Sequence, residues 1–411
     1  MAARRLTRLT VEPGPDGVLA LAAELPDAIS GAGPAIAPIP QGPPGYVDRV
    51  LQAVRPDDDL APLEHDDVAV VVATSGSMGQ PRGVLIPGSA LIASAKATDS
   101  RLGGPARWVL ALPVHHVAGL QVLVRAHLSG VHPIALDTVG GAGSFSAEEF
   151  ALTSRAARGM ADTDGAPLRT ALVPTQLARI MELGSVGIEA LAGYDTVLLG
   201  GAAAPAGLVG RARQLGANIV TTYGMTETAG GCVYDGVPLA GVAVNIVDPD
   251  SEGVGRIELC GPMAAWGYRL RQDLTNEAFS PGMHRTQDVG RLTAENKLEV
   301  LGRIDDIVQV GGINVSVAAV EAVMQSHPSV AEVAVVSVPD SDWGSRLAAF
   351  VVASPNSEVS IDALPGAVAD LTINALGTEA RPRQVDIVSS LPTLPSGKVD
   401  RQELRKLVSG H

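Results

Sequence analysis

The feature that most limits the fold of this chain is a repeated pattern. A short apolar run is followed by a turn rich in Gly, Pro or Ser and then by a helical stretch. The runs cover Val68–Ala73, Arg107–Pro113, Thr170–Val173 and Thr196–Leu199. Runs this short and this apolar are typical of buried strands, and strands that alternate with helices predict a mostly parallel, doubly wound α/β sheet. Because ligands of such sheets bind at the carboxyl ends of the strands, the turns are where a site is expected.

The N-terminal part and the segment after the predicted sheet show different patterns. Residues 1 to about 66 contain many Pro and Gly residues and are interpreted as a connecting and covering segment, with a helix near Tyr46–Val54. An apolar patch at Val18–Ala23 is preceded by Pro and Asp and closed by Glu24, so it does not fit a signal peptide. From Gly236 to about Tyr268, short runs rich in Val and Ile and punctuated by Gly predict a small β subdomain.

The C-terminal part of the chain is expected to form a separate unit. A helix is predicted at Val317–Gln325, and strands at Val330–Val338 and Leu347–Val352. These elements indicate a compact α+β unit of roughly a hundred residues, near the common domain size. We therefore expect a large N-terminal domain, residues 1–304, and a small C-terminal domain, residues 305–411.

Composition and charge argue against several classes of partner. The chain has 30 Lys and Arg residues against 44 Asp and Glu residues, a formal net charge of −14, which disfavours nonspecific binding to nucleic acid or anionic membranes. No apolar run approaches the length of a membrane span. The two cysteines, Cys232 and Cys260, lack metal-ligand spacing and are consistent with a reducing, cytoplasmic location. The oligomeric state is left open, and a homodimer is compatible with the sequence.

The loop after the first predicted strand has the composition of an anion-binding turn. It is the sequence Thr-Ser-Gly-Ser-Met-Gly-Gln-Pro-Arg-Gly-Val at residues 74–84, and it is not a Walker A loop. Glycines let backbone N–H groups turn inward around an anion, hydroxyls add donors, and Arg82 supplies positive charge. On composition alone, an ordinary turn is equally plausible. The candidate phosphate contacts are Thr74, Ser75, Gly76, Ser77, Gly79 and Arg82.

This loop resembles the phosphate loop of the acyl-adenylate-forming superfamily, and the resemblance covers about residues 66–411. Met78 stands where Thr is common and Arg82 where Lys is common, so the positive charge is kept and one hydroxyl is lost. The superfamily fold consists of a large domain of doubly wound sheets with a small β subdomain, followed by a small mobile α+β domain. The resemblance implies ATP and Mg²⁺ as ligands.

A second motif of the superfamily is Thr-Tyr-Gly-Met-Thr-Glu-Thr at residues 222–228, which by composition alone is a polar loop. The resemblance implies that Tyr223 stacks on adenine, that Thr226 binds the α-phosphate, and that Glu227 holds Mg²⁺, a hard ion that prefers carboxylate oxygens. The remaining nucleotide-binding candidates in the two adjacent turns are Gly200, Gly201, Ala202, Thr222, Gly224 and Met225. The small residues suit a flat ring lying against backbone, and they suit a tight strand–helix junction equally well.

Three further elements match the superfamily nearer the C-terminus. Thr-Gln-Asp at residues 286–288 and Gly-Arg at residues 302–303 imply that Asp288 binds the ribose hydroxyls with Arg303 beside it; alone, each would be a surface turn. Asp305 matches the hinge between the domains. Lys398, in Pro-Ser-Gly-Lys-Val-Asp-Arg, matches the catalytic lysine, which would bridge the acyl carboxylate and the α-phosphate. Gly311 and Gly312 are expected to line the channel for the CoA thiol.

The predicted substrate depends on the sequence after the second strand. Residues 112–130 and 229–236 resemble the o-succinylbenzoate–CoA ligases of menaquinone biosynthesis. His116 matches the superfamily histidine that borders the acyl pocket. In these ligases an arginine nine residues later faces a carboxylate of the substrate, and Arg125 occupies that position. Thr175 and Gly224 are further candidates for this pocket. A structural histidine, a solvated arginine and a plain helix start at Thr175 are the alternatives.

The resemblance implies an AMP-forming ligase with o-succinylbenzoate, ATP and CoA as substrates. The acid would attack the α-phosphorus of ATP and release pyrophosphate, and the CoA thiol would then displace AMP. The small domain is expected to rotate at Asp305 between the two steps. Another aryl- or acyl-CoA ligase would share everything except Arg125, and a carrier-protein-charging domain is conceivable. A non-catalytic nucleotide-binding relative is the alternative from another class, given Met78 and Gln287.

Overall fold

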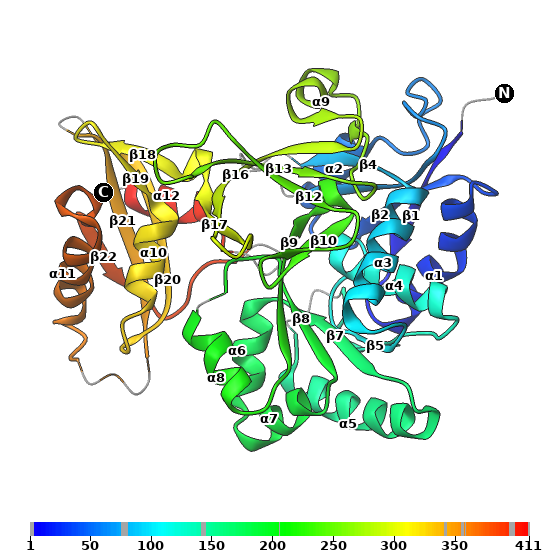
Figure 1. Ribbon diagram of the computed structural model, residues 1–411, viewed down its shortest axis with the longest axis horizontal. Helices are drawn as coiled ribbons and strands as arrows, with labels where there is room; N and C mark the ends of the chain where they lie inside the picture. Colours follow the sequence, from blue (N-terminus) through cyan, green and yellow to red (C-terminus); the bar gives the residue numbers. More distant parts are fainter. Residues whose placement is uncertain are drawn as a thin grey trace.

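The computed structural model describes residues 4–74, 81–140, 145–204, 206–340, 343–354, 357, 359–393 and 399–409. Among these residues the strands form five sheets, three in the N-terminal part and two after residue 306. Figure 1 shows the N-terminal sheets with helices packed against them, and the C-terminal elements gathered on one side of this larger part. No helix in the described part of the chain is long and apolar enough to cross a membrane.

The central sheet is mostly parallel, which confirms the predicted sheet type, but the run Val68–Ala73 lies in a different sheet. Its order is β11-β10-β9-β8-β7-β5-β6; strands β5 to β9 pair in parallel, and β10 and β11 add an antiparallel edge. The strands are β5 (Arg107–Leu110), β6 (Ile134–Ala135), β7 (Leu168–Leu172), β8 (Thr196–Leu199), β9 (Ile219–Met225), β10 (Gly230–Tyr234) and β11 (Val237–Pro238). The helices between them are α4 (Val117–Ser129), α5 (Ala147–Asp164), α6 (Pro174–Glu182), α7 (Ser185–Ala192) and α8 (Ala206–Gln214).

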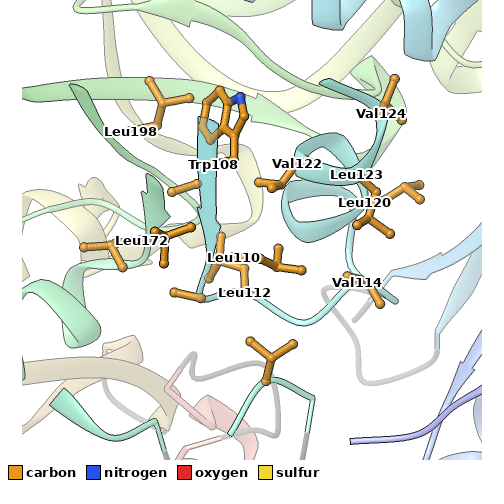
Figure 2. Packing of buried hydrophobic residues seen from close by; sticks show 14 of the residues in the cluster. Trp108, Leu110, Leu112, Val114, Leu120, Val122, Leu123, Val124, Leu172 and Leu198 are labelled. Atoms are coloured by element: carbon orange, nitrogen blue, oxygen red, sulfur yellow. The ribbon is translucent and has the colours of Figure 1, made fainter. Parts of the chain in front are cut away.

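Strand β5 ends three residues before the predicted limit at Pro113. The carbonyl of Ala111 accepts a hydrogen bond from the side-chain amide of Gln176 at 2.9 Å, in place of a neighbouring strand. Within the strand, Trp108 and Leu110 are buried. Figure 2 shows them between side chains of α4, such as Leu120 and Val122, and the leucines Leu172 on β7 and Leu198 on β8. This packing fixes the start of α4 at the carboxyl end of β5.

The second sheet contains residues that the sequence did not assign to strands. Its order is β1-β2-β3-β4-β14, with β1 (Leu6–Val11), β2 (Ala35–Pro40), β3 (Val68–Thr74), β4 (Arg82–Pro87) and β14 (Gly267–Tyr268). The helices are α1 (Pro15–Ser30), α2 (Pro44–Val54) and α3 (Gly88–Leu102). The interpretation of the first 66 residues as a covering segment is therefore wrong, although α2 lies where a helix was expected. Val18 and Leu21, from the apolar patch, are buried on α1.

Strand β2 was not predicted because it contains two prolines, Pro38 and Pro40. Pro38 and Pro40 cannot donate to a strand ladder. In the structure the pairing of β2 with β3 is confined to Ile36 and Val70, so these prolines lie beyond that ladder. The parallel pairing of β2 with β1 continues along both prolines. A proline-containing strand is thus accommodated next to a buried neighbour.

The β subdomain extends further than predicted. Its strands are β12 (Ala243–Val247), β13 (Gly255–Cys260), β15 (Phe279–Ser280), β16 (Met283–Leu292) and β17 (Leu298–Arg303), with α9 (Gln272–Ala278) between β14 and β15. Strand β14 falls inside the predicted limits but pairs with β4 of the second sheet. Because β16 and β17 pair with each other, the motifs at residues 286–288 and 302–303 lie in strands, and the alternative of two surface turns is wrong.

The C-terminal elements confirm the predicted helix and strands. They are β18 (Ile307–Val310), β19 (Ile313–Ser316), α10 (Val317–Gln325), β20 (Val330–Asp340), β21 (Gly344–Ala353), α11 (Leu364–Leu376), β22 (Gln384–Ile387) and α12 (Arg401–Ser409). Their buried apolar clusters contain only residues from this part of the chain. The clusters of the N-terminal part contain none of them. The domain limits at residues 304 and 305 stay a prediction.

Candidate active site

Strands β3 and β4 hold the two ends of the predicted phosphate loop side by side. Thr74 and Arg82 face each other in the antiparallel ladder, and Thr74 Oγ1 donates to the carbonyl of Arg82 at 3.4 Å. The next residue, Gly83, is closely packed: a Cβ there would lie 2.8 Å from the carbonyl oxygen of Ala53. The loop residues Ser75, Gly76, Ser77, Met78 and Gly79 lie outside the described residues.

The turn after β8 is small because neighbouring strands approach it closely. A Cβ at Gly200 would overlap the hydroxyl of Thr222 on β9, and Gly201 has a left-handed backbone with φ +84°. Gly201 and Ala202 are exposed, so backbone is accessible there. Close packing therefore explains Gly200 on its own, whereas the exposed part of the turn is available to a ligand.

The Thr222–Thr228 motif is not a polar loop. Its first four residues belong to β9, and the last three form a short 3₁₀ helix, η1 (Thr226–Thr228). The buried Thr228 hydroxyl lies 3.0 Å from the backbone nitrogen of Met225 and 2.8 Å from the carbonyl of Gly230. These contacts hold η1 at the carboxyl end of the central sheet, with Thr226 and Glu227 beside the end of β9.

Glu227 is joined to the second sheet through both backbone and side chain. Its carbonyl accepts a hydrogen bond from the backbone of Ala265 at 2.9 Å. Its carboxylate Oε1 accepts one from the hydroxyl of Tyr268 at 2.9 Å. The guanidinium of Arg82 lies over the ring of the same tyrosine, 5.2 Å from its centroid. The structure thus links two predicted site residues, Arg82 on β4 and Glu227 on η1, through Tyr268.

A second cluster forms around Asp288 on β16. The Tyr223 hydroxyl donates to Asp288 Oδ2 at 2.7 Å, and Arg303 Nη1 donates to Oδ1 at 3.4 Å. Burial and the carboxylate of Asp288 raise the pKa of Tyr223, which keeps its hydroxyl a donor. Gln287, which departs from the superfamily pattern, is exposed, while Asp288 is buried on the other face of the strand. The departure therefore does not touch the carboxylate.

The two histidines lie at the start of α4. His116 is the N-cap residue, and its carbonyl accepts a hydrogen bond from the backbone of Leu120 at 2.9 Å. The rings of His115 and His116 lie 4.3 Å apart. Burial, reinforced by the neighbouring His116, holds the pKa of His115 well below its usual range. His115 is thus a neutral, buried side chain, while His116 stands at the helix terminus that faces the strand ends.

Arg125 lies two and a half turns further along α4, away from His116. Nine residues of helix separate their Cα atoms by about 13.5 Å. The arginine is 4% exposed, so the alternative of a solvated surface charge is wrong. Its Nη2 donates to Thr98 Oγ1 at 3.4 Å, and its guanidinium lies 5.0 Å from the Trp108 ring. The structure does not bring Arg125 next to His116.

Four polar side chains of the site were not predicted from the sequence. Three of them, Thr98, Gln121 and Tyr234, lie near Arg125, and the fourth, Tyr268, contacts Glu227. Tyr234 and Thr98 share a hydrogen bond of 2.9 Å, and Gln121 Nε2 donates to the carbonyl of Ala229 at 2.7 Å. Gln121 lies four residues before Arg125, a spacing that places both on one face of α4 and could have pointed to a polar stripe. Tyr268 carries no local signal, because its contacts come from distant segments.

The structure gives the positions of four further predicted site residues, while a fifth, Lys398, lies outside the described residues. Thr175 lies in the first turn of α6, where Gln176 rather than Thr175 caps the backbone of Val173. Gly311 and Gly312 both have left-handed backbones at the β18–β19 turn, and a Cβ on Gly311 would lie 2.6 Å from Trp343. Asp305 lies in the 3₁₀ turn η2 (Ile304–Asp306).

The residues present fit a divalent ion that is held mainly by a nucleotide. No group of three or more His, Cys, Asp or Glu side chains that could hold a metal occurs in the part of the chain that the structure describes. Mg²⁺ typically binds one or two carboxylates together with substrate phosphates rather than a complete protein cage. Glu227, a half-buried carboxylate at a strand end beside Arg82, suits such an ion.

Comparison with known proteins agrees with this arrangement. Residues 38–269 match the AMP-binding enzyme family, and residues 319–398 match the AMP-binding enzyme C-terminal domain. The chain belongs to the AMP-binding enzyme family. The first match contains Arg82, Tyr223 and Glu227, the second covers most of the small α+β unit, and Asp288 and Arg303 lie between the two matches.

Two curated relatives are similar to this chain over most of its length. The chain is 37% identical over 387 residues to a "Probable 2-succinylbenzoate–CoA ligase" from Mycobacterium tuberculosis, covering 93% of each chain. It is 29% identical to the 2-succinylbenzoate–CoA ligase of Listeria innocua, covering 82% of this chain and 70% of the relative.

Solved structures have the same fold. The amide bond synthetase McbA from Marinactinospora thermotolerans superposes with a TM-score of 0.79 at 25% identity, covering 99% of this chain and 90% of the other. The o-succinylbenzoate-CoA synthetase of Bacillus subtilis, in complex with its acyl-adenylate, gives a TM-score of 0.72 at 24% identity, covering 98% and 89%.

Proposed function

We propose that the protein is an AMP-forming ligase that joins 2-succinylbenzoate (o-succinylbenzoate) to CoA. The relatives named above supply the identity of the acid. The structural observation that carries the proposal is the buried guanidinium of Arg125, which suits an acid with a second carboxylate. A buried charge is costly unless it is paired and hydrogen-bonded, so this arginine needs an explanation.

The hydrogen bonds of Arg125 leave some of its N–H donors without an acceptor among the described residues. An arginine has five N–H donors. In the described part of the chain, Nη2 forms one long hydrogen bond and Nε has no partner. The neighbouring Asp99 lies 3.7 Å from Arg169; burial raises the pKa of Asp99, while the charges of Arg125 and Arg169 oppose this shift. A substrate carboxylate would supply a further negative charge and the missing acceptors.

The position of Arg125 suits an acid that reaches inward from the nucleotide. Its guanidinium lies at Thr98 and over the Trp108 ring, two and a half helical turns from His116, so the acid would have to extend along α4 between the two residues. We propose that His116, Thr175 and Gly224 border the acid near the reacting carboxylate. Arg125 would bind the carboxylate that is not activated. Benzoate and fatty acids have only one carboxylate, so they could not place one carboxylate at the reacting position and another at Arg125.

The nucleotide would bind across the two clusters at the strand ends. Tyr223 and the turn at Gly200–Ala202 are proposed to receive the adenine ring, and Asp288 with Arg303 the ribose. Thr226 and Arg82 would contact the phosphates. Mg²⁺, when bound with ATP on Glu227, supplies charge neutralisation at the phosphates. The acyl carboxylate then attacks the α-phosphorus, pyrophosphate leaves, and Lys398 is proposed to stabilise the developing charge.

The second half-reaction is assigned to the small domain. We propose that it rotates at Asp305 after adenylation and brings Gly311 and Gly312 toward the acyl-adenylate. The CoA thiol then attacks the acyl carbon and AMP leaves. Packing against Trp343 explains Gly311 on its own, whereas Gly312 is exposed at the β18–β19 turn with open space around it, which is compatible with this role. A cytoplasmic location and a homodimeric state remain predictions.

The proposal is tested by measuring pyrophosphate release with Mg·ATP and CoA. The acids to compare are 2-succinylbenzoate, benzoate and a medium-chain fatty acid. Release with 2-succinylbenzoate alone is expected, together with a thioester product. Release with another acid would keep the reaction and overturn the role of Arg125. ATP binding without release for any acid would instead favour a non-catalytic relative.

A further inference from the structure

Strand β14 connects the two nucleotide-binding segments of the structure. It pairs antiparallel with β4, with Gly267 opposite Leu85 and Tyr268 opposite Val84. The backbone of Arg269 donates to the carbonyl of Gly83 at 2.7 Å, which extends this pairing toward Arg82. Residue 265, just before the strand, donates to the carbonyl of Glu227. Strand β14 therefore lies between the end of the predicted phosphate loop and the predicted metal carboxylate.

The side chain of Tyr268 contacts both of these segments. Its hydroxyl donates to Glu227 Oε1 at 2.9 Å, and the Arg82 guanidinium lies over its ring. Phe279 packs edge-on against the ring at 5.2 Å between centroids, and the tyrosine is only 6% exposed. The ring is thus held on one side by the core, while its hydroxyl and one face are directed at two charged residues.

We propose that Tyr268 is a positioning residue for the metal–nucleotide complex, holding the Glu227 carboxylate through its hydroxyl and the Arg82 guanidinium through its ring. The inference rests on the metal role proposed for Glu227. A hydrogen bond to one oxygen of a ligating carboxylate fixes its orientation and leaves the other oxygen for the ion. Because the donor is neutral, it orients Glu227 without cancelling its charge.

Packing alone does not account for the hydroxyl. A phenylalanine would keep the ring contacts with Phe279 and Arg82. It would lose the hydroxyl, which donates to Glu227 and is also within reach of the Arg82 side chain. The hydroxyl therefore orients Glu227, and the ring makes the contact with Arg82 that a phenylalanine retains. These two roles can be separated by substitution.

The experiment measures ATP binding to the full chain by titration calorimetry, with Mg²⁺ in excess and with Mg²⁺ chelated. Tyr268→Phe removes only the hydroxyl. It is expected to weaken binding of Mg·ATP by about 10-fold or more, the usual effect of losing a partner of a metal ligand, and to weaken binding of metal-free ATP much less. Tyr268→Leu also removes the ring and is expected to weaken metal-free ATP binding as well, through Arg82.

Tyr194 provides a matched control. It is buried, stacks on Phe150, and shares a hydrogen bond of 2.6 Å with Ser154, far from both clusters. Tyr194→Phe is expected to leave the affinities for Mg·ATP and for metal-free ATP unchanged. Its thermal unfolding, compared with that of Tyr268→Phe, shows whether the two losses of a buried hydroxyl cost similar stability.

Glu227→Gln in the same assay separates the inference from the function on which it rests. If this variant keeps the full effect of Mg²⁺, the metal role of Glu227 is wrong. If it loses the effect while Tyr268→Phe keeps it, only the role of Tyr268 is wrong. Equal weakening of both ATP affinities in Tyr268→Phe would also overturn the inference, because a merely structural residue would act in that way. None of these measurements depends on which acid the enzyme uses.

Discussion

The hydroxyl of Tyr223 donates a hydrogen bond to Asp288 Oδ2 at 2.7 Å, joining two strands whose residues are 65 positions apart. The bond connects the central sheet to the β subdomain at the point where both motifs were predicted to bind the nucleoside. The Asp288 carboxylate is held in one orientation, because Tyr223 donates to Oδ2 and Arg303 donates to Oδ1.

Asp288→Asn is therefore expected to weaken ATP binding by about 10-fold or more, since hydrogen bonds to charged groups contribute about 1.5–3 kcal/mol. Equilibrium binding of ATP measures this effect. Gln287→Ala is the matched control, because Gln287 is adjacent but exposed on the opposite face of β16. A similar loss in both variants would contradict a specific role for the carboxylate.

The stability of the protein is expected to fall in mild acid because of His115. Burial, and secondly His116, lower its pKa in the folded state below 6.5. The unfolded chain then binds this proton at a higher pH than the folded protein does. The free energy of unfolding therefore decreases as the pH falls below the unfolded pKa, by at most about 1.4 kcal/mol per pH unit from this group. Burial lowers the pKa of His284 as well, which acts in the same direction.

Denaturant unfolding between neutral pH and the mildly acidic range measures the slope. His115→Asn should lose less stability than the wild type over this interval. His132→Asn, at an exposed position, should keep the wild-type slope. Identical slopes in all three proteins would show that folding does not lower the pKa of His115.

The two half-reactions are expected to respond differently to changes in the small domain. Proline at residue 305 fixes the backbone angle φ, so Asp305→Pro should impair thioester formation more than adenylation. Lys398→Ala should impair adenylation instead, by about 100-fold, as for other groups that stabilise developing charge. Pyrophosphate exchange and thioester formation report the two steps. Equal loss of both steps in Asp305→Pro would contradict the rotation.

Local patterns were enough to predict three strands of the central sheet (β5, β7 and β8) and the elements α10, β20 and β21 of the C-terminal unit. Each of these elements has an apolar run or a clear turn at its ends, as Val317–Gln325 illustrates. Strand β2 was missed because Pro38 and Pro40 argue against a strand locally, and only the short pairing with β3 makes room for them.

The site was predictable only where a motif carries it within a few residues. Glu227 and Asp288 could be selected from such motifs. Tyr268 could not, because its partners Arg82 and Glu227 come from segments far away in the sequence. The burial of Arg125 likewise depends on Trp108 and Thr98, from a strand and a helix that contact α4 only in the folded chain.

The most direct test of the account is the acid preference of Arg125→Met, which removes the charge and keeps much of the volume. We expect kcat/KM for 2-succinylbenzoate to fall by about 10- to 100-fold, as for loss of a charged hydrogen-bond partner, with ATP binding unchanged and benzoate still not used. Arg169→Lys is the control, because Arg169 donates to the backbone of Gly104 and Leu102; it should leave the preference intact. An unchanged preference for 2-succinylbenzoate in Arg125→Met would contradict the proposed recognition of its second carboxylate.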